Sequence, residues 1–556
     1  MTKRGAIYSS NFRTLFKGAF LILAPLFSQA QTTLELSAPL DIPLILSGNF
    51  GEFRGSHFHT GIDIKTQGKE GFPVLAAADG KVERIKVSPW GYGNTLYLKH
   101  GDGSSTVYAH LQRFDSKIQE WVKGRQYKGR VFSIDLTPDV DFNFSVGDTI
   151  GWSGNSGSSG GPHLHFEVRD ASQNPVNPLH WDFPIVDNRP PEVGSLKVIP
   201  VDSQGLEIRE LAIDVKAGDT TEVRSGELHL GVWSIDRLDG ASNVCGVYSI
   251  EVEIDGAKYF ECTIDTLDFS VNKDMNAHVY FPTWKKDRKS VHRLNVLKGD
   301  RLPIYDFVSN TKLRIDKDSI ISVNVLCRDV HGNENYKSYF LSGGDAIIHE
   351  STREVQPAIP SSVTEIRRDG VSVIWPKKSF YSREEVYLEV MDSVEFEIGP
   401  SLIPLAKSFE VSVRLEADMP QDLWVARSVD EKGNASGGIV CKPQVGRLDF
   451  KTRNMGRYRL ERDTIPPMLL PKHSGTPVVK NGDLVFHVED AISGVENIEA
   501  TIDGEWILLN WNPKRKEAIY RATDGAHEIG SRVYVEALVI DAVGLETKWA
   551  GFVQMK

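Results

Sequence analysis

Between residues 34 and 110 the hydrophobic residues come in short apolar or β-branched runs that are separated by Gly, Asp-Gly and Pro. Three such runs lie at 74–78, 82–87 and 95–99. Runs of this length that are bounded by turn residues predict β-strands. The dipeptides Asp79-Gly80 and Asp102-Gly103 are typical of tight hairpins. The pattern therefore predicts an antiparallel β-sheet in this part of the chain.

The rest of the chain repeats one strand pattern. Residues 246–256 and 494–504 carry the same alternation in the same register, and both copies end in Asp-Gly. Pro-Pro pairs precede the two copies, at 190–191 and 466–467. Turns of the form Asp-x-x-Gly follow at 329–332, 541–544 and, without a full copy of the repeat, 430–433. Repeated strand and turn units of this kind predict tandem immunoglobulin-like β-sandwiches.

These signals predict a mainly β protein of several domains, as expected for 556 residues, which exceed what one hydrophobic core usually serves. The expected boundaries are a first β-domain at 31–186, a β-sandwich at 187–348, a β-sandwich at 360–463 and a β-sandwich at 464–556. The sandwich at 187–348 is longer than the last one, which we attribute to an insertion near 265–310.

Residues 1–30 have the pattern of a secretory signal peptide. Four cations precede an apolar run at 19–27, and Ser28-Gln29-Ala30 offers small residues at the cleavage positions. The run is too short for a transmembrane helix, and no later stretch qualifies. We therefore expect an exported protein in the periplasm, the cell envelope or the medium. The formal charge of −11 argues against a nucleic acid partner.

The four cysteines are scattered and form no C-x-x-C pair, which excludes a thiolate zinc knuckle. Cys245 and Cys262 are the one close pair that export would allow to form a disulfide. The alternative is that both are buried free cysteines.

Two histidine-rich stretches about a hundred residues apart carry the candidate chemistry, at 57–63 and 161–167. Alternate side chains of a β-strand share a face, so His163 and His165 point the same way, as do His59 and Asp63. Imidazole nitrogens and a carboxylate oxygen are zinc ligands, and three protein ligands leave the fourth tetrahedral position for water. The two stretches therefore predict one zinc site with a histidine left over for catalysis.

The order of motifs in this region resembles that of lysostaphin-type (LytM-type) zinc endopeptidases. The resemblance covers about residues 50 to 185, roughly a quarter of the chain. The matching segments are Arg54, His59–Ile64 with its H-x-G-x-D motif, 71–82, 92–94, Tyr108-Ala109-His110-Leu111, 147–151, the Gly-rich stretch that leads to His163-Leu164-His165, and Asn177-Pro178.

The resemblance implies a zinc-dependent endopeptidase that cleaves peptide bonds in the stem peptides or cross-links of peptidoglycan. It implies one Zn²⁺ per chain on His59, Asp63 and His165, with His110 and His163 as the catalytic histidines. The division of roles between these two stays open, as does the bond that is cleaved, and no substrate-binding residue is assigned. His57 precedes the motif, and a place near the ligands, a place in the groove or simple exposure all remain open for it.

Two other classes of function remain. The chain is either a catalytically silent wall-binding protein that activates another wall hydrolase, or an adhesin or scaffold that its first domain targets to the wall. The presence of all five histidine and aspartate positions favours the enzyme. The β-sandwiches are candidates for binding a protein partner.

The stretch 112–145 is longer than the corresponding loop of the compact family members. Phe114, Ile118, Trp121 and Val122 lie at helical spacing, and the apolar residues of 132–136 then alternate. The pattern predicts an inserted helix followed by a strand. Because the insertion follows His110, it either borders the active groove or is a surface decoration.

Overall fold

The computed structural model describes residues 34–345, 354–416, 419–472, 483–521 and 531–554. The expected signal peptide at 1–30 lies outside the described residues. Within them, no helix is long and apolar enough to cross a membrane.

The first domain is built on a nine-stranded sheet with the strand order β1-β4-β13-β8-β7-β6-β10, where β11 also pairs with β6 and β14 with β13. All of these pairings are antiparallel, as the short runs predict, and Asp102-Gly103 joins β7 to β8 in the expected hairpin. The strands are β1 (Leu46–Gly48), β4 (Ile62–Lys65), β6 (Gly80–Val87), β7 (Asn94–Lys99), β8 (Ser105–Leu111), β10 (Ile134–Leu136), β11 (Asn143–Phe144), β13 (His163–Arg169) and β14 (Pro175–Val176).

A small sheet and a hairpin complete this domain. The small sheet has the order β5-β12-β9, and β2 pairs with β3. Their bounds are β2 (Phe53–Arg54), β3 (His57–Phe58), β5 (Pro73–Leu75), β9 (Arg113–Phe114) and β12 (Thr149–Trp152). The expectation of a hairpin at Asp79-Gly80 is wrong, because β5 pairs with β12 of the small sheet and β6 pairs with β7 of the large one.

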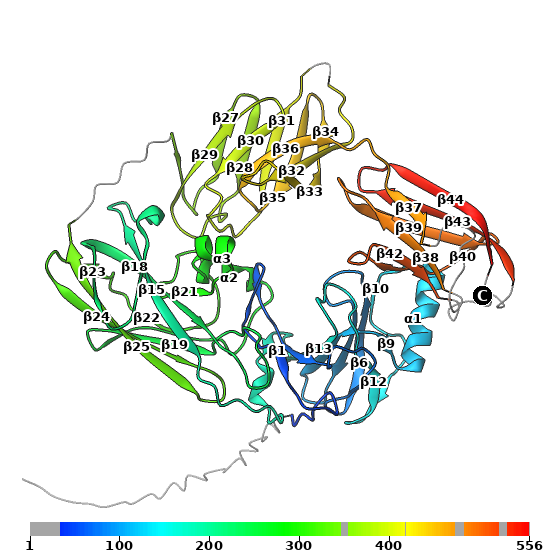
Figure 1. The fold of residues 1–556 in the computed structure, drawn as a ribbon, viewed down its shortest axis with the longest axis horizontal. Coiled ribbons are helices and arrows are strands. Elements are labelled where there is room, and N and C mark those ends of the chain that lie inside the picture. Colours follow the sequence, from blue (N-terminus) through cyan, green and yellow to red (C-terminus); the bar gives the residue numbers. More distant parts are fainter. Residues whose placement is uncertain (1–33, 346–353, 417–418, 473–482, 522–530, 555–556) are drawn as a thin grey trace, which may run out of the picture.

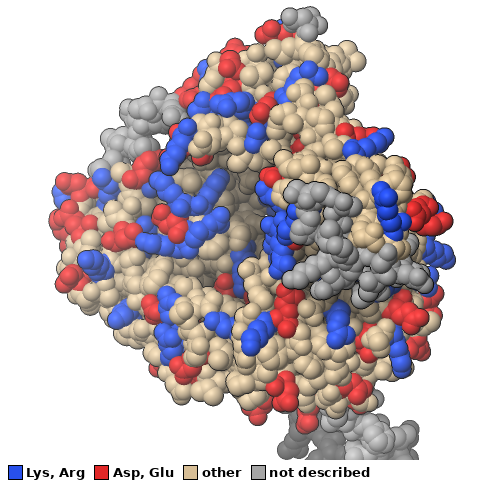
Figure 2. All heavy atoms as spheres, turned by 45° about the vertical axis from the view of Figure 1, so that its right-hand side comes forward, with Lys and Arg blue, Asp and Glu red and all other residues tan. Residues whose placement is uncertain are grey.

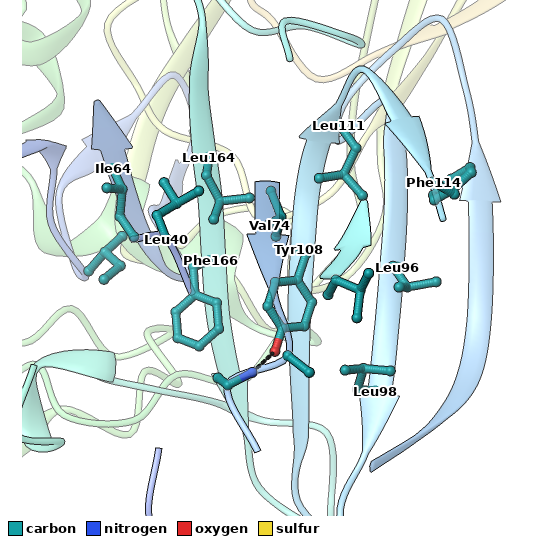
Figure 3. Packing of buried hydrophobic residues seen from close by; sticks show 14 of the residues in the cluster. Leu40, Ile64, Val74, Leu96, Leu98, Tyr108, Leu111, Phe114, Leu164 and Phe166 are labelled. Atoms are coloured by element: carbon teal, nitrogen blue, oxygen red, sulfur yellow. Dashed lines mark hydrogen bonds between the residues drawn. The ribbon is translucent and has the colours of Figure 1, made fainter. Parts of the chain in front are cut away.

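The core of the first domain lies between the two sheets. Alternate residues of the central strands, such as Leu164 and Phe166 on β13 and Tyr108 on β8, point into it and are fully buried. Figure 3 shows these side chains packed together, with the Tyr108 hydroxyl accepting a hydrogen bond of 2.8 Å from the backbone N–H of Ala77. The opposite face of the same strands is thereby free to carry polar side chains.

The predicted helix and strand are both present within 112–145. Helix α1 (Ser116–Gly129) begins after Asp115, whose carboxylate accepts from the Lys117 N–H, a typical N-cap. Ile118 and Val122 are buried against the core, and β10 and β11 extend the large sheet beside β6. The insertion is therefore an integral part of the domain.

Beyond residue 186 the described chain forms three further pairs of sheets, each pair enclosing its own hydrophobic cluster. The first pair is β16-β15-β18-β21, with β23 on β18, and β17-β25-β24-β19-β20-β22. Its strands are β15 (Glu192–Val201), β16 (Ile213–Val215), β17 (Thr220–Arg224), β18 (Gly226–Ile235), β19 (Ser249–Ile254), β20 (Ala257–Thr263), β21 (Val291–Arg293), β22 (Tyr305–Val308), β23 (Arg314–Ile315), β24 (Ile320–Arg328) and β25 (Glu334–Gly344).

The second pair is β26-β29-β30-β36-β32-β33 and β27-β28-β31-β35-β34. Its strands are β26 (Gln356–Ala358), β27 (Thr364–Arg368), β28 (Val371–Trp375), β29 (Glu384–Val390), β30 (Glu395–Gly399), β31 (Phe409–Arg414), β32 (Trp424–Val429), β33 (Ala435–Val440), β34 (Lys442–Gln444), β35 (Arg447–Thr452) and β36 (Gly456–Arg462).

The third pair is β37-β38-β42-β41 and β40-β39-β43-β44. Its strands are β37 (Met468–Pro471), β38 (Leu484–Glu489), β39 (Val495–Ile502), β40 (Glu505–Trp506), β41 (Asn510–Asn512), β42 (Glu517–Tyr520), β43 (Arg532–Asp541) and β44 (Glu546–Gln554). We refer to the three pairs as the second, third and last modules.

The repeated sequence forms the same hairpin in the second and last modules. Asp255-Gly256 joins β19 to β20 and Asp503-Gly504 joins β39 to β40, and all four residues have positive φ. A two-residue turn with positive φ at both positions favours Asp-Gly, which explains why this dipeptide closes both copies.

The expected insertion near 265–310 contains helices α2 (Met275–His278) and α3 (Phe281–Asp287). Together with neighbouring residues it forms a hydrophobic cluster with the β2–β3 hairpin, in which Trp284 packs against Phe53. The second module is therefore joined to the first domain by a shared core. All four cysteines are buried and free, so the Cys245–Cys262 pair is not a disulfide.

The modules follow one another around a ring, and the last module returns to α1 of the first domain (Figure 1). Two contacts between described residues close the ring. The rings of Tyr127 and Trp506 meet edge to face with centroids 5.4 Å apart. The Lys514 ammonium donates hydrogen bonds to the carbonyl groups of Ser159 and Asn155. In space-filling view the molecule is hollowed between the modules, and lysine and arginine side chains gather along the hollow (Figure 2).

Candidate metal centre

The three expected ligands converge at one end of the large sheet. His165 on β13 lies directly opposite Asp63 on β4, as expected for neighbouring strands. His59 lies in the segment between β3 and β4, so the expectation that it shares a strand with Asp63 is wrong. At Gly61 a Cβ would lie 2.3 Å from the Phe166 carbonyl oxygen, which explains why the motif between His59 and Asp63 requires glycine.

The ligand atoms lie within hydrogen-bonding distance of one another. His165 Nδ1 is 2.9 Å from Asp63 Oδ1 and 3.0 Å from His59 Nε2, and the latter is 3.2 Å from Asp63 Oδ1. All three side chains are buried. Two imidazole nitrogens and one carboxylate oxygen directed at one point fit a metal ion with three protein ligands.

A hydrogen-bonding partner orients each of the three expected ligands from the side that faces away from the other two. His59 Nδ1 donates to the Asn49 carbonyl at 2.7 Å, which leaves Nε2 with a lone pair for a metal ion. Arg54 donates to Asp63 Oδ2 at 2.8 Å and holds Oδ1 towards the histidines. His165 Nε2 is 2.9 Å from Glu167 Oε1. Such partners fix the tautomer and direction of metal ligands.

Glu167, for which the sequence left open an orienting or a capping role, lies in the orienting position. Its carboxylate is fully buried and accepts hydrogen bonds from the hydroxyls of Thr60 and Tyr92. It also forms an ion pair with Arg169. Burial raises its pKa, but Arg169 and the hydrogen bond from His165 outweigh this and hold the pKa below its usual range. Glu167 is therefore an anion beside His165.

The ligand carboxylate is also ionised. Burial raises the pKa of Asp63, but the three histidines around it hold that pKa well below its ordinary value. Burial lowers the pKa of His165, while hydrogen bonds to Asp63 and Glu167 raise it to about 9. Two carboxylates therefore stabilise positive charge at this imidazole. Their negative charge favours the binding of a cation at the centre.

The two remaining histidines border the same centre. The rings of His110 on β8 and His163 on β13 have centroids 4.7 Å apart, and His163 Nε2 is 3.4 Å from Asp63 Oδ1. His110 Nδ1 donates to the Ser156 carbonyl at 2.9 Å, and His163 Nδ1 to the Gly161 carbonyl at 2.8 Å. In the neutral form of each ring, the lone pair is therefore on Nε2.

His110 is held in its neutral form. Burial, and next the charge of His163, lower its pKa to about 3. Its backbone has a φ of 60°, a left-handed conformation that is uncommon for a residue with a side chain and that accumulates at functional sites.

Two loops that support His110 pack without space between them. A Cβ at Gly157 would lie 2.3 Å from the Gly93 nitrogen, and both glycines have positive φ. The hydroxyl of Ser156 in one loop accepts from the Asn94 N–H in the other. This contact fixes the Ser156 carbonyl that holds the His110 ring.

The structure separates His57 from the centre. His57 is exposed in the β2–β3 hairpin and is not among the converging groups. Sequence reasoning gave no role to Arg54, Thr60 or Tyr92, although Arg54 and the Tyr92-Gly93-Asn94 segment belong to the motifs that carried the resemblance. Their positions beside Asp63 and Glu167 identify them as orienting residues.

A basic pocket of about 420 Å³ begins at the tip of the hairpin that carries His57. Gly55 and Ser56 line one side, and no acidic residue lines it. None of its four cations forms an ion pair within the part of the chain that the structure describes. These cations are Lys273, Lys285, Arg288 and Arg453.

Residues 57–145 match the family described as Peptidase family M23; this range includes His59, Asp63 and His110. The DD-carboxypeptidase/endopeptidase Mpg of Neisseria meningitidis serogroup B is 38% identical over 126 residues, 23% of this chain and 23% of that relative. The murein hydrolase activator NlpD of Salmonella dublin is 31% identical over 160 residues, 28% of this chain and 34% of that relative.

Among solved structures, the catalytic domain of lysostaphin from Staphylococcus simulans is 25% identical, with a TM-score of 0.19, and the match covers 25% of this chain and 90% of that one. The chain thus spans only about a quarter to a third of the curated relatives that it matches.

Proposed function

We propose that this chain, which carries an M23 peptidase domain near its N-terminus followed by several β-sheet domains, is an exported zinc endopeptidase that hydrolyses peptide bonds in peptidoglycan. The observation that carries the proposal is the convergence of His59 Nε2, Asp63 Oδ1 and His165 Nδ1 within 3.2 Å of one another. Each atom is held in place by a partner that leaves its lone pair free.

One Zn²⁺ bound to these atoms would supply a polarised water and a Lewis acid for the scissile carbonyl. The protein's own groups then have to move a proton and stabilise an oxyanion. His163 is our candidate for the general base, because its Nε2 lies beside the Asp63 carboxylate. His110, which is neutral and hydrogen-bonded through Nδ1, would orient the water or the oxyanion.

The alternative is a silent protein that activates another wall hydrolase, a possibility that the NlpD relative illustrates by its name. The enzyme is supported by the closeness of the five groups that we assign to it and by the orienting partners of His59 and Asp63. The enzyme is therefore favoured. We further propose that the β-sheet modules are immunoglobulin-like and bind the wall or a protein partner.

The first test is the zinc content of the purified mature protein. We expect close to one zinc per chain in the parent and a sharp loss in His59→Ala, Asp63→Ala and His165→Ala, because each variant leaves an incomplete ligand set. His57→Ala is the matched control, since this neighbouring histidine is exposed and should keep the zinc. A zinc content equal to that of the parent in all three ligand variants would contradict the assignment of the metal ligands.

The second test is the release of soluble muropeptides from isolated sacculi. The enzyme proposal requires release by the zinc-loaded protein alone. The activator proposal predicts release only when a second hydrolase is added.

A further inference from the structure

A cluster of three aspartates lies where the third module meets the last one. Asp463 follows β36 in the linker, Asp490 follows β38, and Asp541 ends β43. The three residues each offer a carboxylate oxygen within 4.8 Å of the others. The cluster therefore joins the linker to both sheets of the last module.

The charge of this cluster is not offset by the protein. Asp463 and Asp541 are 0% and 1% exposed. No lysine or arginine forms an ion pair with any of the three among the described residues. Backbone N–H groups satisfy Asp541 Oδ1, but its Oδ2 is buried and has no hydrogen-bond partner. A buried carboxylate oxygen without a partner is costly, so this atom points to a missing cation.

A related arrangement occurs where the first domain meets the second module, where Asp187, Asp329 and His331 each offer a ligand atom within 4.8 Å of the others. Asp187 lies three residues before its Pro-Pro pair, as Asp463 does before its own. Asp236 follows β18 and Asp329 follows β24, and with Asp187 and His331 they line a cavity of about 10 Å³, close to the space that one water molecule or ion needs. Asp187 Oδ2 and Asp236 Oδ1 are buried without hydrogen-bond partners.

The third module provides an internal comparison. Its Asp-x-x-Gly turn carries Asp430, whose oxygens are satisfied by Lys432 and Asn434, and which is exposed. Asp430 belongs to no cluster of metal-ligating groups in the described chain. The turn by itself therefore does not produce a cluster. A cluster forms where an aspartate of the linker and an aspartate at the end of a second strand lie beside the turn.

We propose that each of the two junctions binds one Ca²⁺ ion, which fixes the last module and the second module to the chain that precedes them. Calcium is the cation whose preference for six to eight oxygen ligands at flexible geometry fits clustered carboxylates and nearby backbone carbonyls. These sites differ from the zinc centre, where two of the three ligand atoms are nitrogens. The inference is independent of the proposed peptidase activity.

Repulsion between the clustered carboxylates also supports a bound cation at each junction. Burial, and next the charges of Asp187 and Asp329 among its neighbours, raise the pKa of Asp236 to about 7. Burial also raises the pKa of Asp541, to which Asp463 and Asp490 contribute. Carboxylates arranged in this way share either a proton or a cation.

The test uses the full mature chain, stripped with a chelator and reloaded with zinc alone. Calcium chloride should then bind with a stoichiometry of two per chain and a Kd on the order of 10⁻⁴ to 10⁻³ M or tighter, and it should raise the melting temperature more than magnesium chloride does. Asp541→Asn and Asp329→Asn should each bind one calcium fewer. Asp430→Asn, the matched control, should bind two.

Three outcomes would overturn the proposal. The first is no calcium uptake by the parent at millimolar concentrations, and the second is unchanged uptake in both cluster variants. The third is a calcium-insensitive parent that Asp541→Asn stabilises, which would show that the carboxylates share a proton. If Asp541→Asn does not fold, Asp490→Asn at the half-buried position of the same cluster replaces it. Asp63→Ala should lose zinc and keep both calcium ions, which separates this proposal from the peptidase.

Discussion

Asp63 divides its two carboxylate oxygens between two tasks. Oδ1 faces His59, His163 and His165, whereas Oδ2 accepts from Arg54, which also pairs with Glu52. A residue with both oxygens engaged has one fixed direction, and the metal centre depends on that direction because three ligand atoms must meet at one point. Residues that touch no metal ion thus determine where the ion would bind.

At the residue scale we predict that His110→Ala and His163→Ala keep their zinc and lose hydrolysis of sacculi by a factor of about 10² to 10⁴, as expected for general acid–base groups. Zinc content and the rate of muropeptide release measure the two effects separately. His100→Ala is the control, because that histidine bonds Asp79 and Thr106 on the same sheet, away from the centre. Rates of muropeptide release equal to the parental rate in both variants would contradict the catalytic roles of His110 and His163.

Helix α3 and the segment around it connect the second module to the rim of the active site. Trp284 donates a hydrogen bond to the Gly55 carbonyl in the β2–β3 hairpin, and Asn272 bonds both backbone groups of Phe58. The basic pocket lies in this junction. If the chain hydrolyses peptidoglycan as proposed, these unpaired cations would offer a complement to the carboxylates of its stem peptides.

At the element scale we predict that the double variant Lys285→Gln, Arg288→Gln raises KM several-fold for anionic muropeptides and leaves kcat near the parental value. The reason is that a pocket which binds the substrate equally in the ground and transition states contributes to KM and not to kcat. Lys451→Gln, a surface cation paired with Glu410, serves as the control. A fall in kcat at unchanged KM would contradict a binding role for the pocket.

A second element-scale prediction concerns acid stability. His278 of α2 and His292 of β21 are buried and hydrogen-bonded to each other at 3.0 Å. Burial lowers the pKa of His292 from 6.5 to about 3 and also lowers that of His278. Between these two values the unfolded chain binds a proton that the folded chain excludes, so the free energy of unfolding falls as the pH falls below about 6.5.

The expected loss is on the order of 4 kcal/mol by pH ~3 for His292. Denaturant unfolding between pH 7 and pH 3 measures it. His292→Gln should show a shallower pH dependence than the parent, and His487→Gln, at a half-exposed histidine of the last module, is the control. Equal slopes in all three proteins would show that the pair does not control acid stability.

Around the whole molecule, the chain closes a ring whose last contact lies at the active-site loop. Lys514 bonds the carbonyl of Ser159, and the hydroxyl of Ser159 lies 3.1 Å from His163 Nδ1. The last module thereby stands next to the entrance of the metal centre. Under the proposed function, large substrates would reach the centre through the hollow of the ring or after this contact opens.

At this scale we predict that Lys514→Ala combined with Trp506→Ala increases the hydrolysis of intact sacculi relative to small soluble muropeptides, because both ring-closing contacts are lost. The ratio of the two rates is the measurement. Lys548→Ala, on the far strand β44 of the same module, is the control. An unchanged ratio would mean that the ring does not limit access.

Much of this protein follows from local sequence. The strand runs, the Asp102-Gly103 hairpin and the helical spacing within 112–145 produce the elements that they predict, because turn geometry and amphipathic spacing act over a few residues. The Asp79-Gly80 hairpin does not form, because the strands on either side of it pair in different sheets. The order of motifs likewise identifies the residues that meet at the candidate centre, since β4, β8 and β13 are adjacent strands whose alternation directs their side chains to one face.

What the sequence left open depends on contacts between residues far apart in the chain. The loop position of His59, the exposure of His57 and the orienting roles of Arg54 and Tyr92 depend on which strand ends and loops meet. The shared core of Phe53 and Trp284, the aspartate clusters and the ring closure at Lys514 arise only when separate modules pack together. The periodic patterns of the sequence do not predict such contacts, because these contacts depend on how whole sheets pack against one another.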